Sequence, residues 1–407
     1  MLVDIHSLGH FNRLAKRGSE QAANSLSRLT GVEVRVDVTN IALLARSDLS
    51  DAFGDDDYVG VEIEFMGGME GDTVLAFERE CSERLVELLL PGRDVASDDE
   101  LARSGVKELG NIMTSGFIDG WANHLGTTID ISPPTYIERS GTELLDGKGP
   151  EENEELFLFE SRLTTADRDL DFYIYMSPEH SAMTELMAAN RRDEGDAIPV
   201  DKLSVFNEMM KRGAEGAASH ITAMTGVQTS VDVSRLSFVP IADAPDRVGD
   251  DRYAGVVLGI EGLPSGYLLI LFDEASAQNV AEALLPVETE GDGLGEMERS
   301  AIKELGNIMT SGFIDGWANV LGTSINHTPP QFVHDMGSAI MSPVVGRLAQ
   351  TQDYAFMIDS AVETAEGRFS CDMYALPDER ELERALDALA PGQVDTESAE
   401  ADVDELF

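Results

Sequence analysis

The chain has 407 residues, of which 76 are acidic and 29 are basic, and 43% of its residues are hydrophobic. This length exceeds one ordinary hydrophobic core and fits two domains of about 200 residues each. The excess of acidic residues argues against a nucleic-acid ligand. It is typical of a folded protein whose surface is adapted to high salt, as in halophilic archaea.

The sequence lacks features that mark several other classes of protein. No apolar run of 18 or more residues occurs, and the first residues lack the pattern of a signal peptide. We therefore expect a cytoplasmic protein without a membrane-inserted segment. The two cysteines, Cys81 and Cys371, lie too far apart to suggest a disulfide framework or a metal-binding pair. The histidines show no ligand spacing, so we expect no cofactor or metal in this chain.

The spacing of apolar residues predicts helices and strands in a recurring order of helix, strand, hairpin and short helix. In the first module these elements are expected at 10–30, 31–38, 58–78 and 80–90. In the second they are expected at 101–126, 127–137, 155–176 and 180–189. The second half of the chain follows the same order, so four modules are predicted.

The two halves are copies of each other. The longest match pairs 107–127 with 303–323 and has one difference in 21 positions, His124 against Val320. A weaker match pairs 12–38 with 207–233 at nearly the same offset. Because repeats of this length indicate structural units of equal fold, the sequence predicts a tandem duplication.

We therefore predict an α+β fold with two tandem domains, each a pseudo-twofold pair of modules whose long helices pack on an antiparallel-rich sheet. The expected domains span 1–195 and 196–390, followed by an acidic tail at 391–407. Their modules are expected at 1–95, 100–195, 200–290 and 296–390. Polar or Gly-rich linkers are expected at 92–100, 191–199 and 288–296.

The repeated helix has two faces. At 100° per residue its apolar residues fall on one arc, expected to be buried: Val106, Leu109, Met113, Phe117, Gly120 and, at the edge, Trp121. The opposite arc forms a polar ridge of Ser104, Glu108, Asn111, Ser115 and Asp119. Glycines at 110, 116 and 120 disfavour a helix by up to about 1 kcal/mol each, which predicts that something packs closely against its backbone.

A solvated helix face is the simplest interpretation of Glu108 and Asn111. Asparagine is nevertheless a weak helix former, and the second copy repeats the ridge with Ser300, Glu304 and Asn307. Recent gene conversion could also preserve this spacing. A double proline follows each helix at the same distance, ending at Pro134 and at Pro330, and strand termination would account for both.

These residues resemble the motif of the CheC, CheX and FliY phosphatases of bacterial and archaeal chemotaxis. That motif is Asp or Ser, three residues, Glu, two residues, Asn, twenty-two residues, Pro. It fits twice, at Ser104, Glu108, Asn111 and Pro134, and at Ser300, Glu304, Asn307 and Pro330. The resemblance covers nearly all of both halves but not the acidic tail, and each half is similar to one CheC domain.

The other two modules depart from the motif. The Glu, Asn and Pro positions hold Arg13, Lys16 and Thr39 in the first module, and Glu208, Lys211 and Ser234 in the third. A lysine cannot offer both the donor and the acceptor of an amide. We therefore expect two working sites, one in each domain, and two retired ones.

The resemblance implies a substrate, the phosphorylated response regulator CheY, whose aspartyl phosphate is hydrolysed by water. Asn111 and Asn307 would position the attacking water, and Glu108 and Glu304 would anchor a lysine of the regulator. Any magnesium ion would belong to the regulator.

The alternative is a non-catalytic adaptor that binds the receptor deamidase CheD or a flagellar switch. The short helices at 80–90, 180–189 and 274–285 could form its docking surfaces, although ordinary amphipathic packing is the simpler interpretation. The terminal residues DVDELF could be a peptide ligand or a loose tail.

Overall fold

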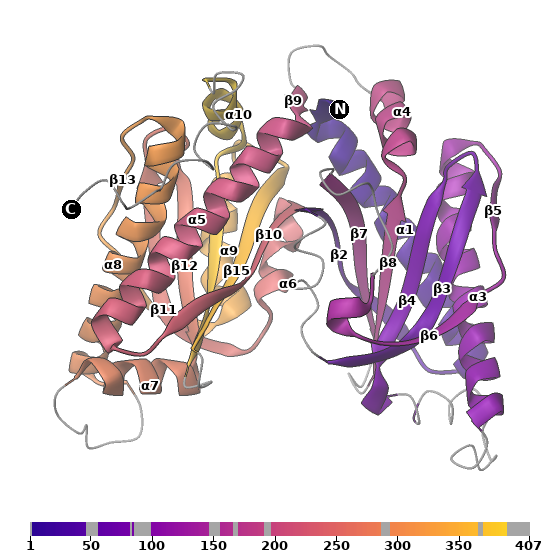
Figure 1. Ribbon diagram of the computed structural model, residues 1–407, viewed down its shortest axis with the longest axis horizontal. Helices are drawn as coiled ribbons and strands as arrows, with labels where there is room; N and C mark the ends of the chain where they lie inside the picture. Colours follow the sequence, from indigo (N-terminus) through magenta and orange to yellow (C-terminus); the bar gives the residue numbers. More distant parts are fainter. Residues whose placement is uncertain are drawn as a thin grey trace, which may run out of the picture. The chain divides into compact units, whose positions relative to one another are not determined.

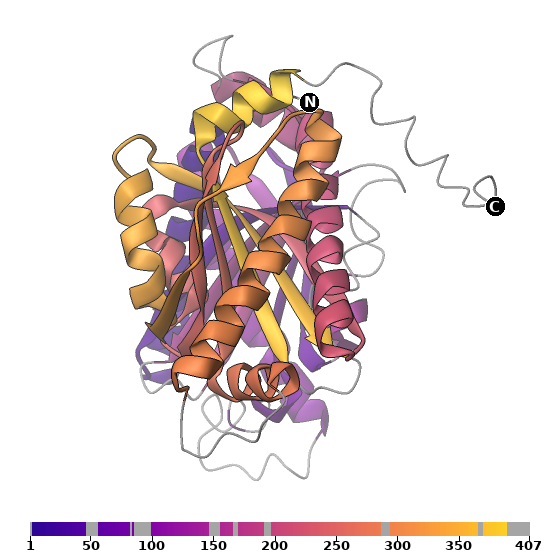
Figure 2. The same ribbon diagram turned by 90° about the vertical axis from the view of Figure 1, so that its left-hand side faces the viewer.

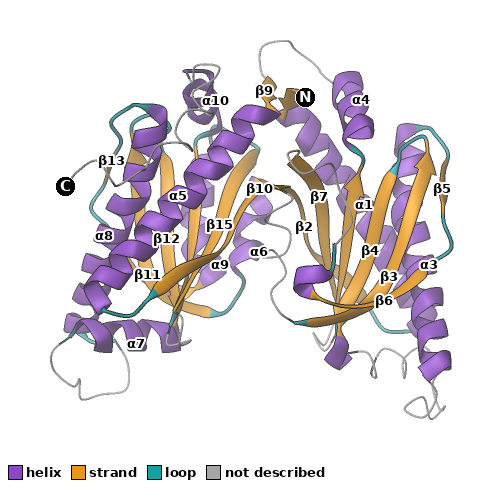
Figure 3. Cartoon of the chain, viewed as in Figure 1, coloured by secondary structure: helices purple, strands orange, loops and turns teal. Residues whose placement is uncertain are grey.

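The computed structural model describes residues 2–45, 56–81, 84, 99–145, 155–165, 170–190, 197–285, 294–364 and 369–388. They form two compact units, whose helices and strands are drawn in Figures 1 and 3. The N-terminal unit contains Asp4–Glu194 together with Arg235–Arg247, and the C-terminal unit contains the remainder of the chain. Among the described residues, no helix is both long enough and apolar enough to cross a membrane.

The N-terminal unit consists of one antiparallel sheet with its helices. Its elements are α1 (Ile5–Thr30), β2 (Val34–Ala45), β3 (Asp57–Gly67), β4 (Gly71–Glu78), η2 (Arg79–Cys81), α3 (Asp99–Leu125), β5 (Ile129–Ile131), β6 (Thr135–Ser140), η4 (Gly141–Glu143), β7 (Glu155–Thr165), β8 (Asp171–Pro178), α4 (His180–Asn190), the second part of β10 (Thr229–Pro240), η5 (Ile241–Asp243) and α6 (Ala244–Val248). The strand order is β10–β2–β7–β8–β4–β3, and both β5 and β6 pair with β3.

The C-terminal unit repeats this arrangement. Its elements are β1 (Leu2–Asp4), β9 (Ala197–Pro199), α5 (Val200–Thr225), the first part of β10 (Thr229–Pro240), β11 (Arg252–Glu261), β12 (Gly266–Asp273), α7 (Glu274–Leu284), α8 (Glu296–Leu321), β13 (Asn326–His327), β14 (Gln331–Met336), α9 (Gly337–Leu348), β15 (Tyr354–Thr364), β16 (Ser370–Pro377) and α10 (Glu379–Ala388). The order β10–β15–β16–β12–β11, with β13 and β14 both on β11, matches the order β2–β7–β8–β4–β3 of the N-terminal unit.

The predicted fold class is confirmed, with two tandem domains of helix, strand, hairpin and helix modules. In each unit the two long helices pack against each other, and Figure 2 shows α5 and α8 across one face of the C-terminal sheet. The predicted short helices are present as α4 and α7, whereas most of 80–90 lies outside the described residues.

Glycine allows the long helices to approach closely. A Cβ atom on Gly120 of α3 would lie 3.0 Å from the Cα atom of Gly18 in α1, tighter than ordinary van der Waals contact. Gly126 ends α3 with a φ of 64°, a left-handed conformation that favours glycine. The predicted close packing and the predicted helix end are therefore both present.

Aromatic residues fill the space between α1, α3 and the sheet. Trp121 is fully buried, with its ring centroid 4.9 Å from that of Phe159 on β7 and 6.2 Å from that of Phe11 on α1. Phe117 is buried beside it. Trp317 takes the equivalent place in the C-terminal unit and packs on Phe313 of its own helix. This core fixes one face of each motif helix and leaves the opposite face outward.

Some elements differ from expectation. Helix α9 was not among the predicted elements. Its buried residues Ile340, Met341, Val344 and Leu348 show helical spacing, and Pro343 lies inside it. The motif helices begin at Asp99 and Glu296, inside two expected linkers. Residues 92–98, residues 288–293 and the tail at 391–407 lie outside the described residues, and the predicted domain limits stay predictions.

Candidate active site

The predicted ridge of α3 lies on the outer side of the helix. Ser104 and Glu108 are exposed and Asn111 is half-buried, whereas Leu109 and Met113 on the opposite face are fully buried. Within the part of the chain that the structure describes, the side chains of Glu108 and Asn111 form no hydrogen bond or ion pair. Both polar tips are therefore available to a second molecule.

Helix α8 presents the same ridge in the C-terminal unit. Ser300 and Glu304 are exposed and Asn307 is half-buried. The helix starts after Gly295 and ends before Gly322, which has a φ of 59°. The Ser311 hydroxyl donates a hydrogen bond of 3.0 Å to the backbone carbonyl oxygen of Asn307. The side-chain carboxamide of Asn307 takes no part in this bond.

The double prolines form a bulge beside the sheet edge instead of ending the sheet. Between the pairs Phe65–Ile131 and Glu62–Thr135, β3 advances three residues while the proline segment advances four. The same count of three against four holds in the C-terminal unit between Ile260–His327 and Val257–Gln331. Pro134 and Pro330, both half-buried, lie in these bulges. Strands β5 and β13 end before the prolines, as strand termination predicts, and pairing with the same neighbour resumes in β6 and β14.

Packing places the motif turn of α3 close to this bulge. Gly110 lies directly on Val61 of β3, so near that an added Cβ atom would overlap the Val61 side chain. Val61 pairs with Tyr136 of β6, two residues after Pro134. Gly306 lies on Val256 in the same way. The glycine that weakens the helix therefore brings the motif turn of each helix close to the strand beside the proline segment, with the Glu and Asn residues on the outer face.

A charged cluster that sequence reasoning missed adjoins the N-terminal turns of α3. Arg103 lies with its guanidinium 5.2 Å from the centroid of the Tyr136 ring and 3.5 Å from a Glu138 carboxylate oxygen. The Tyr136 hydroxyl donates to Glu138 at 2.7 Å, and Arg79 lies 3.3 Å from Glu138. The hydrogen bond from Tyr136 and the charge of Arg79 hold the pKa of Glu138 below its usual value. Burial, with Glu138 nearby, raises the pKa of Tyr136 to about 12.

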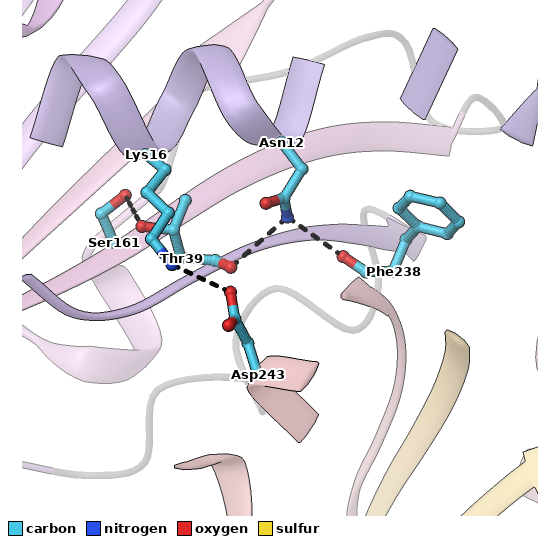
Figure 4. A network of polar contacts seen from close by, with 6 residues as sticks. All are labelled: Asn12, Lys16, Thr39, Ser161, Phe238 and Asp243. Carbon is cyan, nitrogen blue, oxygen red and sulfur yellow. Dashed lines mark hydrogen bonds and ion pairs between the residues drawn. The ribbon is translucent and has the colours of Figure 1, made fainter. Parts of the chain in front are cut away.

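In the first module, where the sequence predicts a retired site, the Asn position of the motif is in contact with another segment of the chain, as Figure 4 shows. Lys16, which stands at the Asn position of the motif, forms an ion pair of 3.1 Å with Asp243, in the segment 235–247 of the same unit. Asn12, fully buried, donates to the carbonyl oxygens of Thr39 at 3.3 Å and of Phe238 at 3.4 Å. The motif face of α1 thus binds a segment that follows α5 in sequence.

The structure describes only some of the other residues that stand at motif positions in the first and third modules. Thr39, at the proline position, is buried, and its hydroxyl lies 3.3 Å from that of Ser161. Arg13 is exposed and Lys211 is half-buried. The side chains of Glu208 and Ser234 lie outside the described part of the chain.

Comparisons with known proteins point to one family. The profile of the CheC-like family matches residues 101–138 and 297–334. CheC1 of Halobacterium salinarum, provisionally named a CheY-P phosphatase, is 36% identical over 182 residues, which cover 44% of this chain and 92% of that protein. The CheY-P phosphatase CheC of Bacillus subtilis is 22% identical over 201 residues, covering 48% of this chain and 96% of its own. The crystal structure of Thermotoga maritima FliY covers 46% of this chain and 98% of its own, with 18% identity and a TM-score of 0.39.

The fold and the repeated ridge define a protein of two pseudo-symmetric α+β domains, each with one outward Glu and Asn pair on a long helix. The chain belongs to the CheC-like family, as its identity to CheC1 over nearly the whole of that protein shows. The family expected from the motif is thereby confirmed.

Proposed function

We propose that this chain dephosphorylates a CheY-type response regulator at two sites, one on α3 and one on α8. Relatives named as CheY-P phosphatases support the reaction class. The observation that carries the proposal is the pair of outward Glu and Asn side chains on each helix, held from behind by a buried face and free of hydrogen bonds and ion pairs with other described side chains.

Asn111 and Asn307 are the residues assigned to the attacking water. Phosphoryl transfer needs little covalent work from the protein, so positioning of the nucleophile and electrostatics dominate. A carboxamide has a donor and an acceptor side by side and can therefore hold a water molecule in line with the phosphorus atom. Half-burial restricts the motion of this short side chain. Positioning of this kind is worth about 10²-fold in rate.

Glu108 and Glu304 are assigned to docking. Each lies three residues before its asparagine, almost one turn along the helix, and is exposed. An exposed carboxylate suits an ion pair with a lysine of the regulator, which would fix the register of the complex. The magnesium ion used in aspartyl phosphate chemistry is assigned to the regulator.

The test is phosphate release from a phosphorylated CheY-type regulator. We expect Asn111→Ala combined with Asn307→Ala to lower the rate by about 10²-fold while regulator binding is largely retained. Each single variant should keep the activity of the other site. Asn123→Ala combined with Asn319→Ala provides the matched control, because these asparagines lie on the same helices outside the motif. Unchanged phosphate release by the first double variant would overturn the proposal.

The same assay separates an enzyme from an adaptor. An adaptor would bind the regulator or the deamidase CheD without accelerating phosphate release. Glu108→Gln combined with Glu304→Gln should instead weaken regulator binding if the glutamates anchor a lysine. Binding without phosphate release in the unmodified chain would favour the adaptor.

A further inference from the structure

A triad of exposed charges adjoins the motif helix of the N-terminal unit. Arg79 lies between two carboxylates, 3.5 Å from Asp57 and 3.3 Å from Glu138. Arg103, one residue before the motif serine, extends this group toward the helix through its contacts with Glu138 and Tyr136. The triad therefore has a central cation and two outer anions.

The corresponding triad of the C-terminal unit has a different set of side chains. Glu274 lies between Arg252, at 3.2 Å, and His334, at 3.1 Å. Arg299, one residue before Ser300, lies 5.5 Å from the centroid of the Phe332 ring. Here the centre is an anion, and the outer residues are an arginine and a histidine.

The two triads occupy the same places in the fold. Glu138 is opposite Val59 in the pairing of β6 with β3, and His334 is opposite Ala254 in the pairing of β14 with β11. Asp57 and Arg252 begin the equivalent strands β3 and β11. Arg79 and Glu274 come directly after the equivalent strands β4 and β12. The charge is therefore reversed at the central position and at one outer position, and a histidine replaces the second outer carboxylate.

The stability of the fold gives no reason to prefer one arrangement of charges in the triads over the other. Every side chain in the two triads is partly exposed, from 25% for His334 to 63% for Asp57. Pairs of this kind contribute about 0–1 kcal/mol, and a swapped pair ties the same strands together as well as the original. The fold does not distinguish the two arrangements, whereas a docking protein would meet two outer carboxylates in the N-terminal unit and an outer arginine and histidine in the C-terminal unit.

A partner seated on the ridge would also cover the triad. A standard interface buries about 800 Å² on each side, equal to a disc of about 16 Å radius. Arg103 precedes Asn111 by eight residues, which correspond to about 12 Å along a helix. Arg103 contacts Glu138 directly, so the triad begins inside this footprint.

We propose that the two triads give the two motif sites different partner preferences. The N-terminal site favours a response regulator with a basic residue facing Asp57 and Glu138, and the C-terminal site favours one with an acidic residue facing Arg252 and His334. This inference rests on the proposed function for its partner class. Electrostatic complementarity at an interface rim selects partners and sets association rates, so the difference belongs in KM and in binding.

The test uses the full chain with one site silenced. Asn307→Ala isolates the N-terminal site, into which Asp57→Arg, Arg79→Glu and Glu138→His are introduced together. The probes are one phosphorylated CheY-type regulator in two forms, with lysine or glutamate at a surface position beside its phosphorylation site. We expect the exchange to raise KM for the lysine form and lower it for the glutamate form, each about fivefold at moderate salt, without changing kcat. Binding affinity is measured in parallel.

Two further variants complete the experiment. The reciprocal exchange, Arg252→Asp, Glu274→Arg and His334→Glu with Asn111→Ala, should shift the preference of the C-terminal site in the opposite direction. The matched control swaps the exposed pair Glu33 and Arg35, which lies outside the triad. Equal shifts for the triad and the control, in KM and in binding, would overturn the inference. A transferred binding preference without phosphate release would support the inference and overturn the proposed function.

Discussion

Helices α1 and α3 of the N-terminal unit carry different residues at equivalent positions of the motif. Helix α3 has Glu108 and Asn111 on its outer face, with no hydrogen bond or ion pair from their side chains to other described residues. Helix α1 has Arg13 and Lys16 at those positions, and Lys16 is engaged by Asp243. Both helices retain a fully buried opposite face. The comparison shows that the two helices share a buried packing face while their outer faces carry different residues and contacts.

The buried faces of α3 and α1 also differ at one position. A substitution at this position is expected to change the free energy of unfolding more than any other discussed below. Gly110 of α3 corresponds to Ala15 of α1, two residues after the Glu position of the motif. Ala15 is fully buried, whereas a methyl group at Gly110 would overlap Val61. We expect Gly110→Ala to lower the free energy of unfolding of the N-terminal unit by about 1–3 kcal/mol through overpacking.

Gly306→Ala should have the same effect on the C-terminal unit, because Gly306 lies on Val256. Chemical denaturation of each variant measures the change. The helix propensity of alanine alone predicts the opposite sign, a gain of about 1 kcal/mol. Such a gain would show that α3 and α1 are seated alike and that the glycine is not needed for close approach to the sheet.

The contact between Lys16 and Asp243 is expected to have a smaller effect. The two side chains are 45% and 32% exposed, so solvent screens their attraction. A double-mutant cycle of Lys16→Ala and Asp243→Ala should give a coupling free energy of about 0–1 kcal/mol. The exposed pair Glu33 and Arg35 is the reference. A coupling above about 2 kcal/mol would mean that the segment 235–247 is bound to α1 mainly through this ion pair rather than through Asn12 and the pairing of β10 with β2.

The smallest expected effect concerns Tyr136, whose counterpart in the C-terminal unit is Phe332. Removing its hydroxyl with Tyr136→Phe should raise the pKa of Glu138, because the hydrogen bond from Tyr136 is the largest cause of its lowering. A carboxyl with a lowered pKa stabilises the folded state above its unfolded pKa, and this contribution is lost as pH falls through the folded pKa. As pH falls, the stabilisation that the Glu138 carboxylate gives to the folded state should therefore be lost at a higher pH in the variant than in the unmodified chain.

NMR titration of the Glu138 side chain tests this expectation. The substitution gives the N-terminal unit the same ring that Phe332 supplies in the C-terminal unit, so the stacking of Arg103 on the ring is kept while the hydroxyl is lost. An unchanged pKa of Glu138 would show that the arginines hold the carboxylate in its charged form without help from the hydroxyl.

Much of the site could be predicted from the sequence because it depends on one helix. The spacing of Leu109, Met113 and Phe117 fixes the buried face, and the outward position of Glu108 follows from it. The repeat offset identified Asn307 as the counterpart of Asn111. Roles in the reaction remain predictions, since geometry alone does not test them.

The remaining features depend on contacts that cross the repeats or on residues that differ between them. The pairing of Asp243 with Lys16 joins residues 227 positions apart, and no local pattern indicates it. The triads could not be found by matching identical residues between the repeats, because equivalent positions hold different residues in the two units. Recurring Arg103 and Arg299, each followed by a motif serine, were the available signal.

The placement of the two tryptophans has a practical consequence. The chain contains two, and Trp121 and Trp317 occupy the same fully buried place beneath the motif ridge, one in each unit. Tryptophan fluorescence therefore comes from a single indole per domain. Replacing either one by phenylalanine would leave an optical reporter for the unfolding of the other domain alone, without any added label.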